Sequence, residues 1–148
     1  MPRAVLPLLA LLAGCVPIVT VTQPEVEIVV TDDRGAPIAG AIVNFASQLY
    51  GPDGETEFVE IKADQSGVAR LPKKSYLQIA VLIVDGVALY GWSYCIEKTG
   101  FEPAIGNHLD KKYFKDSPTR VSLARSEAAV ICTWNKDWRG DFYSAVEE

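Results

Sequence analysis

The stretch from Val29 to Val43 reads VVTDDRGAPIAGAIV, and it carries the strongest fold signal in the chain. Its first residues end a segment of alternating apolar and polar side chains that starts at Val26, which is typical of a half-buried β-strand. The turn that follows ends at Gly35, where aspartate supplies local hydrogen bonds and glycine supplies a positive φ. Pro37 then stiffens the crossover to a second apolar segment. The stretch therefore predicts strand, turn, crossover and strand.

A second stretch, Ala63 to Pro72, reads ADQSGVARLP and contains the same Asp-x-x-Gly turn before a short strand. Together, the two turns and the Pro-Ile-Ala-Gly-Ala piece between them resemble the carboxypeptidase regulatory-like domain of the prealbumin (transthyretin-like) fold. The segments 99–102 (TGFE) and 120–123 (RVSL) resemble the Gly-aromatic step and the closing strand of that family. The resemblance covers about residues 25–125 and leaves out an apparent insertion at 104–118 and the tail after Ala124.

This resemblance implies a fold and a class of role, but no reaction. Domains of this family serve as small structural or binding modules. Two groups of enzymes have a related architecture, the intradiol dioxygenases and the transthyretin-like hydrolases of purine breakdown, but both need more than one histidine. The chain has a single histidine, so no catalytic residue is carried over from either group.

The hydrophobic pattern predicts one domain, residues 25–148, built as an all-β, antiparallel β-sandwich of seven to eight strands. The segment Tyr76–Val84 is nearly all apolar, so we expect a central strand covered on both faces. Only Ile105–Lys115 places apolar residues at helix-like offsets, and we expect a short helical insertion there. The expected strands are Val26–Thr31, Ala41–Leu49, Glu57–Ala63, Val68–Leu71, Tyr76–Val84, Val87–Glu97, Thr119–Ala124 and Ala128–Trp134.

The N-terminal residues 1–14 have the pattern of a secretory signal, a short positive start followed by an apolar run too short to span a bilayer. The run ends in Leu-Ala-Gly-Cys, which resembles the lipobox of bacterial prolipoproteins and predicts lipidation of Cys15. The alternative is an ordinary signal peptide that contains a cysteine. Residues 15–24 would then form a lipidated tether. Val16 stands where aspartate would retain an enterobacterial lipoprotein in the inner membrane, which favours an outer-membrane anchor facing the periplasm or the cell surface.

Lipidation of one of the three cysteines leaves Cys95 and Cys132 in an oxidising compartment. A disulfide between them would close a loop of 37 residues and would stabilise the fold by roughly 3–4 kcal/mol in the chain-entropy model. The alternative is a pair of separate buried thiols.

The composition excludes some classes of function. The 148-residue chain is 49% hydrophobic with a net charge of −5, which speaks against a nucleic-acid binder. The single histidine excludes multi-histidine metal chemistry, and the acidic residues, such as Asp32 and Asp64, lack the spacing of a calcium loop and fit turn chemistry. We therefore expect no cofactor and no enzymatic activity.

The leading hypothesis is a membrane-anchored envelope lipoprotein that acts as a structural or partner-binding module. The second is a periplasmic glycan- or peptide-binding module that uses Trp92, Trp134 or Trp138. The competing interpretation of these tryptophans is packing over the open end of the sandwich near Cys132. The third hypothesis is a small hydrolase built on His108, against the simpler reading of an exposed loop histidine.

Overall fold

A computed structural model of the chain describes residues 15–50, 54–81, 89–110, 112–114, 118–135 and 140–146. Among these residues the protein is all β, with eleven strands and no helix. The strands are β1 (Cys15–Gln23), β2 (Val26–Asp32), β3 (Ile42–Tyr50), β4 (Thr56–Lys62), β5 (Val68–Leu71), β6 (Lys74–Val81), β7 (Leu89–Glu97), β8 (Ala104–Leu109), β9 (Thr119–Leu123), β10 (Val130–Asn135) and β11 (Asp141–Val146). The all-β prediction is confirmed, and the eight expected strands correspond to β2–β7, β9 and β10.

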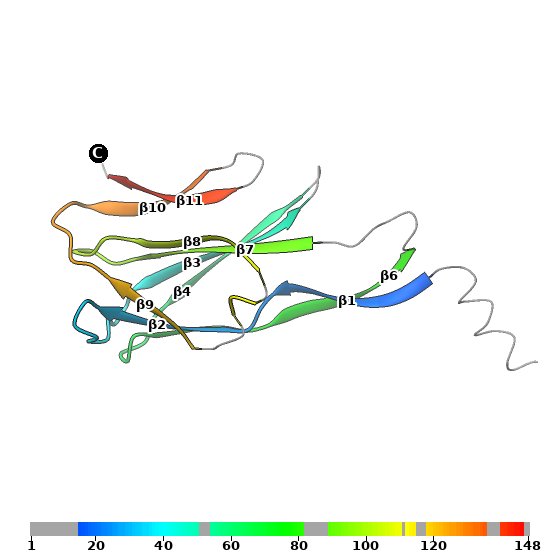
Figure 1. The fold of residues 1–148 in the computed structure, drawn as a ribbon, viewed down its shortest axis with the longest axis horizontal. Coiled ribbons are helices and arrows are strands. Elements are labelled where there is room, and N and C mark those ends of the chain that lie inside the picture. The colour runs from blue at the N-terminus through cyan, green and yellow to red at the C-terminus, as the bar shows by residue number, and fades with distance from the viewer. Residues whose placement is uncertain are drawn as a thin grey trace, which may run out of the picture.

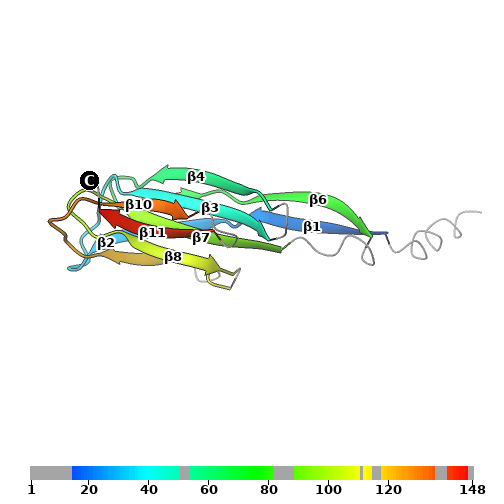
Figure 2. The same ribbon diagram turned by 90° about the horizontal axis from the view of Figure 1, so that it is seen from above.

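The strands form four sheets. The largest has the order β4-β3-β7-β8, and its neighbour has the order β5-β2-β9. Figure 1 shows the β10–β11 hairpin above the four-stranded sheet and β2 and β9 below it. The remaining pair, β1 and β6, extends beyond the body as a two-stranded ribbon (Figure 2).

One core cluster joins the two larger sheets. In β2, Val26, Ile28 and Val30 are buried and alternate with partly exposed residues, as the sequence pattern predicts. They share the cluster with the tyrosine and tryptophan face of β7, which includes Tyr94 and Ile96. Burying each such side chain contributes about 1.5–3 kcal/mol. The opposite face of β7 carries Cys95, which belongs to a second, smaller cluster under the hairpin.

Both Asp-x-x-Gly turns have the same hydrogen bonds. Asp32 Oδ1 accepts the N–H groups of Arg34 and Ala36, and Asp64 Oδ1 accepts those of Ser66 and Val68, at 2.8–3.1 Å. Gly35 and Gly67 have φ of +80° and +74°, as expected for glycine in this position. The predicted turns are therefore present. The second turn packs on β2, because the N–H of Val30 donates to the Gly67 carbonyl at 2.8 Å.

The expected helical insertion is wrong. Residues 104–109 form β8, which pairs antiparallel with β7, and a turn follows at 112–114. The apolar residues at helix-like offsets serve the core instead, since Phe114 is buried against Phe45 and Trp92. The expectation of antiparallel pairing throughout is also wrong, because β9 runs parallel to β2.

Strands β1, β8 and β11 raise the number above the seven to eight expected. Residues 15–23, expected as part of a tether, form β1 and pair with β6, since their β-branched residues favour an extended ladder. Strand β6 is not the central strand that was expected. It lies in the ribbon, with Leu77 and Ile79 exposed by 67% and 73%. The connection between the expected strands Tyr76–Val84 and Val87–Glu97 falls within residues 82–88, which lie outside the described residues.

Candidate functional site

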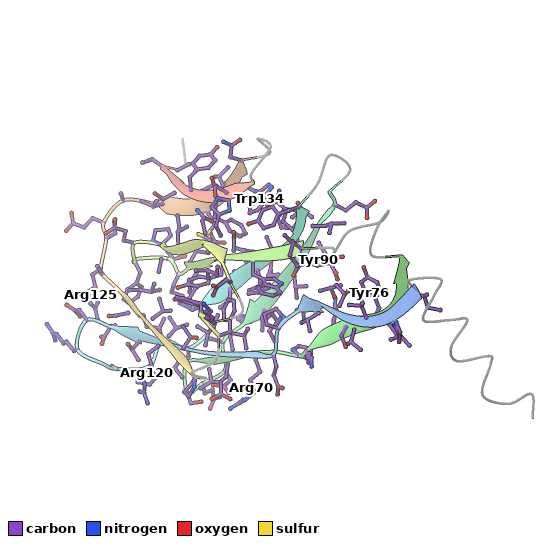
Figure 3. The ribbon with its side chains drawn as sticks, turned by 45° about the vertical axis from the view of Figure 1, so that its right-hand side comes forward. Arg70, Tyr76, Tyr90, Arg120, Arg125 and Trp134 are labelled. Atoms are coloured by element: carbon purple, nitrogen blue, oxygen red, sulfur yellow. A yellow bond between two sulfur atoms is a disulfide. The ribbon has the colours of Figure 1, made fainter. Side chains whose placement is uncertain are left out.

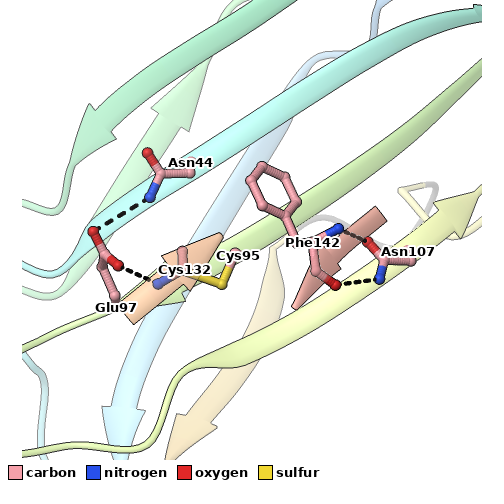
Figure 4. Close-up of a disulfide and its surroundings, with 6 residues drawn as sticks. All are labelled: Asn44, Cys95, Glu97, Asn107, Cys132 and Phe142. Carbon is pink, nitrogen blue, oxygen red and sulfur yellow. Dashed lines mark hydrogen bonds between the residues drawn. A yellow bond between two sulfur atoms is a disulfide. The ribbon is translucent and has the colours of Figure 1, made fainter. Parts of the chain in front are cut away.

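A disulfide and side-chain hydrogen bonds fix the β10–β11 hairpin on the outer face of the four-stranded sheet. Cys95 of β7 and Cys132 of β10 form the disulfide that the cysteine count predicts, with their Cα atoms 6.0 Å apart. Beside it, the Glu97 carboxylate accepts the N–H of Cys132 at 2.7 Å (Figure 4). On the other hairpin strand, the Asn107 side chain donates to the Phe142 carbonyl and accepts the Phe142 N–H, at 2.9 and 3.0 Å.

Three aromatic rings meet where the hairpin crosses the sheet. The ring of Trp134 on β10 stands edge-on to Phe58 of β4 and to Phe142 of β11, with centroid distances of 5.1 and 4.8 Å. They border a hollow of about 450 Å³, which also has polar walls. The polar side chains along the hollow belong to Asn44, Glu60 and Glu97. We call the site formed by these three polar residues and the three aromatic rings the aromatic hollow. Its six residues are Asn44, Phe58, Glu60, Glu97, Trp134 and Phe142.

The aromatic hollow has the composition of a ligand site for polar organic molecules. Phe58 is 52% exposed although it is a large apolar residue, so part of its ring is available to a ligand. Aromatic faces beside carboxylates and an amide suit sugars and peptides, which present both C–H surfaces and hydrogen-bonding groups. Phe58 could not be singled out from its local sequence, because its aromatic partners lie far along the chain, on β10 and β11.

The three tryptophans singled out from the sequence have different positions. Trp134 lies at the aromatic hollow and is labelled in Figure 3. The proposal of Trp92 as a ligand contact is wrong, because Trp92 is only 5% exposed and its indole N–H donates to the Thr22 carbonyl at 2.8 Å. Trp92 therefore belongs to the core and to the base of the ribbon. Trp138 lies outside the described residues.

His108 has partners that the sequence could not reveal. It is the last residue but one of β8 and has a φ of +54°, and its Nε2 lies 2.5 Å from Asp141 Oδ1. Its Nδ1 lies 3.2 Å from the Tyr50 hydroxyl. Both ring nitrogens thus face protein groups, which favours a role in holding β11 and β3 against β8. A general base needs a ring nitrogen that is free to face its substrate. The small hydrolase built on His108 stays a hypothesis.

The shifted pKa values lie at structural positions. The hydrogen bond from the Ser66 hydroxyl, followed by that from the Val68 N–H, lowers the pKa of Asp64. Burial, followed by the hydrogen bond with Tyr113, raises the pKa of Tyr94, whose hydroxyl lies 2.9 Å from that of Tyr113. Burial and the neighbouring Tyr76 raise the pKa of Tyr90. These groups belong to a turn, the core and the ribbon base.

The described residues contain no group of three or more His, Cys, Asp or Glu side chains placed to hold a metal ion. Asp32 and Asp64, the acidic residues considered as calcium ligands, direct an oxygen at backbone N–H groups of their own turns. In the described part of the chain, no helix has the length and apolar character needed to cross a bilayer.

Comparisons with known proteins give no further assignment: the chain matches no protein-family model, no curated protein and no solved structure.

Proposed function

We propose that the protein is a lipid-anchored envelope protein, and that its domain is a prealbumin-like β-sandwich with a non-enzymatic structural or partner-binding role. One observation carries the proposal: Cys15, the residue that ends the lipobox-like Leu-Ala-Gly-Cys, is the first residue of strand β1. Strand β1 leads from that cysteine along a ribbon that projects from the body (Figure 1). An acyl chain on Cys15 would thus anchor the body through this ribbon, whose strand β1 is about 30 Å long for nine residues.

The sandwich assignment has its own support. Residues of the three-stranded and four-stranded sheets form one core cluster, and both Asp-x-x-Gly turns occur in the order that the resemblance implies. The hairpin β10–β11 lies after the part of the chain that the resemblance covers, and its disulfide joins it to the body.

Metabolic labelling with palmitate tests the anchor. We expect the wild-type protein to incorporate label and Cys15→Ser to lose it, because the thiol is the acceptor. The matched control is Cys95→Ser with Cys132→Ser, which removes two thiols from the disulfide and is expected to keep the label. Label that persists in Cys15→Ser would refute the lipoprotein assignment.

Substitution of Val16, the residue after Cys15, tests which membrane holds the protein in an enterobacterial host. We expect wild type, with Val16, to fractionate with the outer membrane on a density gradient, and Val16→Asp to move toward the inner membrane. Val16→Ser serves as the control for a polar change at this position. Wild type found in the inner-membrane fraction would contradict the outer-membrane location.

A second candidate function is glycan or peptide binding, and the aromatic hollow favours it. We expect peptidoglycan to retain the protein, and Trp134→Ala and Phe58→Ala to reduce retention about 5- to 150-fold, since truncating an aromatic contact residue costs about 1–3 kcal/mol. Tyr143→Ala is the control, because Tyr143 is 46% exposed but does not border the hollow. Trp138→Ala tests the tryptophan outside the described residues. No retention of wild type would exclude peptidoglycan as the ligand.

A further inference from the structure

The ribbon of β1 and β6 carries an apolar strip on one face. In an antiparallel pair, residues opposite each other share a face, and so do alternate residues along each strand. Val19 lies opposite Leu77, and Pro17 lies opposite Ile79. These four residues therefore share one face, and all four are exposed, Val19 by 64%, Leu77 by 67% and Ile79 by 73%. We call them the ribbon strip.

The other face of the ribbon turns toward the body near its base. Thr20, which lies on that face, is only 7% exposed. The base itself is fixed by the indole N–H of Trp92 on the Thr22 carbonyl and by the Gln23 side chain, which donates to the Pro72 carbonyl at 2.5 Å. The ribbon strip is thus held in a set direction and is not covered by the domain.

The ribbon also lacks charge. Neither β1 nor the part of β6 from Ser75 to Val81 contains Asp, Glu, Lys, Arg or His. The nearest cations along the chain are Lys73 and Lys74 at its base, and both are exposed. An uncharged surface with large exposed apolar side chains is unusual for a soluble monomer and marks a contact surface.

We propose that the ribbon strip contacts the lipid surface of the membrane that holds the acyl anchor, with the ribbon lying in the headgroup region. This inference rests on the proposed function, because the ribbon starts at Cys15. Val19 is four residues from Cys15, so at about 3.3 Å per residue an acyl chain on Cys15 would keep Val19 within about 13 Å of the anchored atom. The local concentration of lipid around the ribbon strip would therefore be far higher than that of any free partner.

The geometry favours a position on the membrane rather than across it. In a two-stranded sheet each strand has one edge whose backbone N–H and C=O groups lack a strand partner, and such groups are costly in hydrocarbon. A ribbon lying flat keeps these edges hydrated while the ribbon strip faces the acyl chains.

The test uses a chain that cannot be acylated. The chain from residue 15 onward contains every described strand, and Cys15→Ser removes the acceptor thiol. We expect this protein to cosediment with vesicles of phosphatidylethanolamine and phosphatidylglycerol. Leu77→Ser with Ile79→Ser is expected to lower the partition coefficient about tenfold or more, because two apolar side chains leave the lipid contact.

Two controls keep the result specific. Ile131→Ser with Val146→Ser removes two exposed apolar side chains from the hairpin and is expected to change partitioning less than about twofold. Val19→Thr preserves the side-chain shape and the strand preference of valine. We expect this variant to bind vesicles more weakly, and such a loss cannot be ascribed to misfolding. Formation of the Cys95–Cys132 disulfide confirms the fold of each variant.

Three results would overturn the proposal. The first is that the parent chain does not cosediment with vesicles, and the second is that both double variants lose partitioning equally. The third is that the parent chain forms a dimer without vesicles, and that Leu77→Ser with Ile79→Ser dissociates this dimer. The last result would assign the ribbon strip to a second copy of the chain. Palmitate labelling of Cys15 is independent of all three, so failure of the ribbon contact and failure of the lipid anchor can be told apart.

Discussion

Gly67 has a backbone conformation and a surrounding space that both require glycine. Its φ is +74°, and a Cβ there would lie 2.5 Å from the Val30 carbonyl oxygen and 3.1 Å from the Ile38 nitrogen. We expect Gly67→Ala to lower the free energy of unfolding by about 3 kcal/mol, measured by urea denaturation. Gly100→Ala is the control, because Gly100 has a φ of +84° with nothing within 4 Å and should lose only about 1 kcal/mol. Equal losses would show that the contact with Val30 does not matter.

Asp64 predicts a dependence of stability on pH. Its hydrogen bonds from Ser66 and Val68 hold its pKa below the ordinary value of 3.8 in the folded state. The charged form therefore stabilises the fold above the unfolded-state pKa, and this contribution is lost as the pH falls through the lower, folded-state pKa. We expect the gap in urea midpoint between wild type and Asp64→Asn to narrow as the pH falls from about 7 to about 2. A gap that widens toward low pH would contradict the assigned hydrogen bonds.

At the scale of single residues, the sequence predicts what depends on near neighbours. Both Asp-x-x-Gly turns were expected because the aspartate and the N–H groups it accepts lie within four residues. The contacts of His108 could not be expected, since Asp141 and Tyr50 are 33 and 58 residues away. Only the fold of β8, β11 and β3 brings these groups together.

At the scale of elements, two incorrect predictions have one physical origin. The residues of a segment do not determine which other elements pack against it. The apolar run in β6 looks like a core strand, but its partner is β1, and the pair projects away from the body. The apolar residues after β8 look helical, but Phe114 turns inward against Trp92. The aromatic hollow was missed in part for the same reason, since Phe58 gains its role from β10 and β11.

The hairpin β10–β11 is predicted to be the element most dependent on the disulfide. A two-stranded hairpin is marginal alone, and only the disulfide joins it covalently to the sheet. We expect Cys95→Ala with Cys132→Ala to lower the free energy of unfolding by about 3–4 kcal/mol. Amide hydrogen exchange should rise more in β10 and β11 than in β3, because the hairpin opens locally. A uniform rise across all three strands would mean that the hairpin unfolds only with the whole domain.

At the scale of the whole molecule, the two proposed contact surfaces lie apart. Figure 3 shows Trp134 on the hairpin and Tyr76 out on the ribbon. The aromatic hollow packs on the cluster around Cys95, whereas Val21 ties the ribbon to the main core. A ligand at the hollow and a membrane at the ribbon strip would therefore be able to bind together, which suits a protein that links its anchor to a partner.

This separation predicts independent energetics, which a pair of double-mutant cycles measures. Ile79→Ser on the ribbon and Trp134→Ala on the hairpin share no contact, so their effects on the free energy of unfolding should add within about 0.5 kcal/mol. Phe58→Ala and Trp134→Ala remove rings whose centroids are 5.1 Å apart, and should couple by about 0.5–1.5 kcal/mol. Urea denaturation of each set of four proteins gives both values. Coupling between ribbon and hairpin as large as that between the two rings would mean that the anchor end and the binding end form one rigid unit, and that a ligand at the hollow affects how the ribbon meets the membrane.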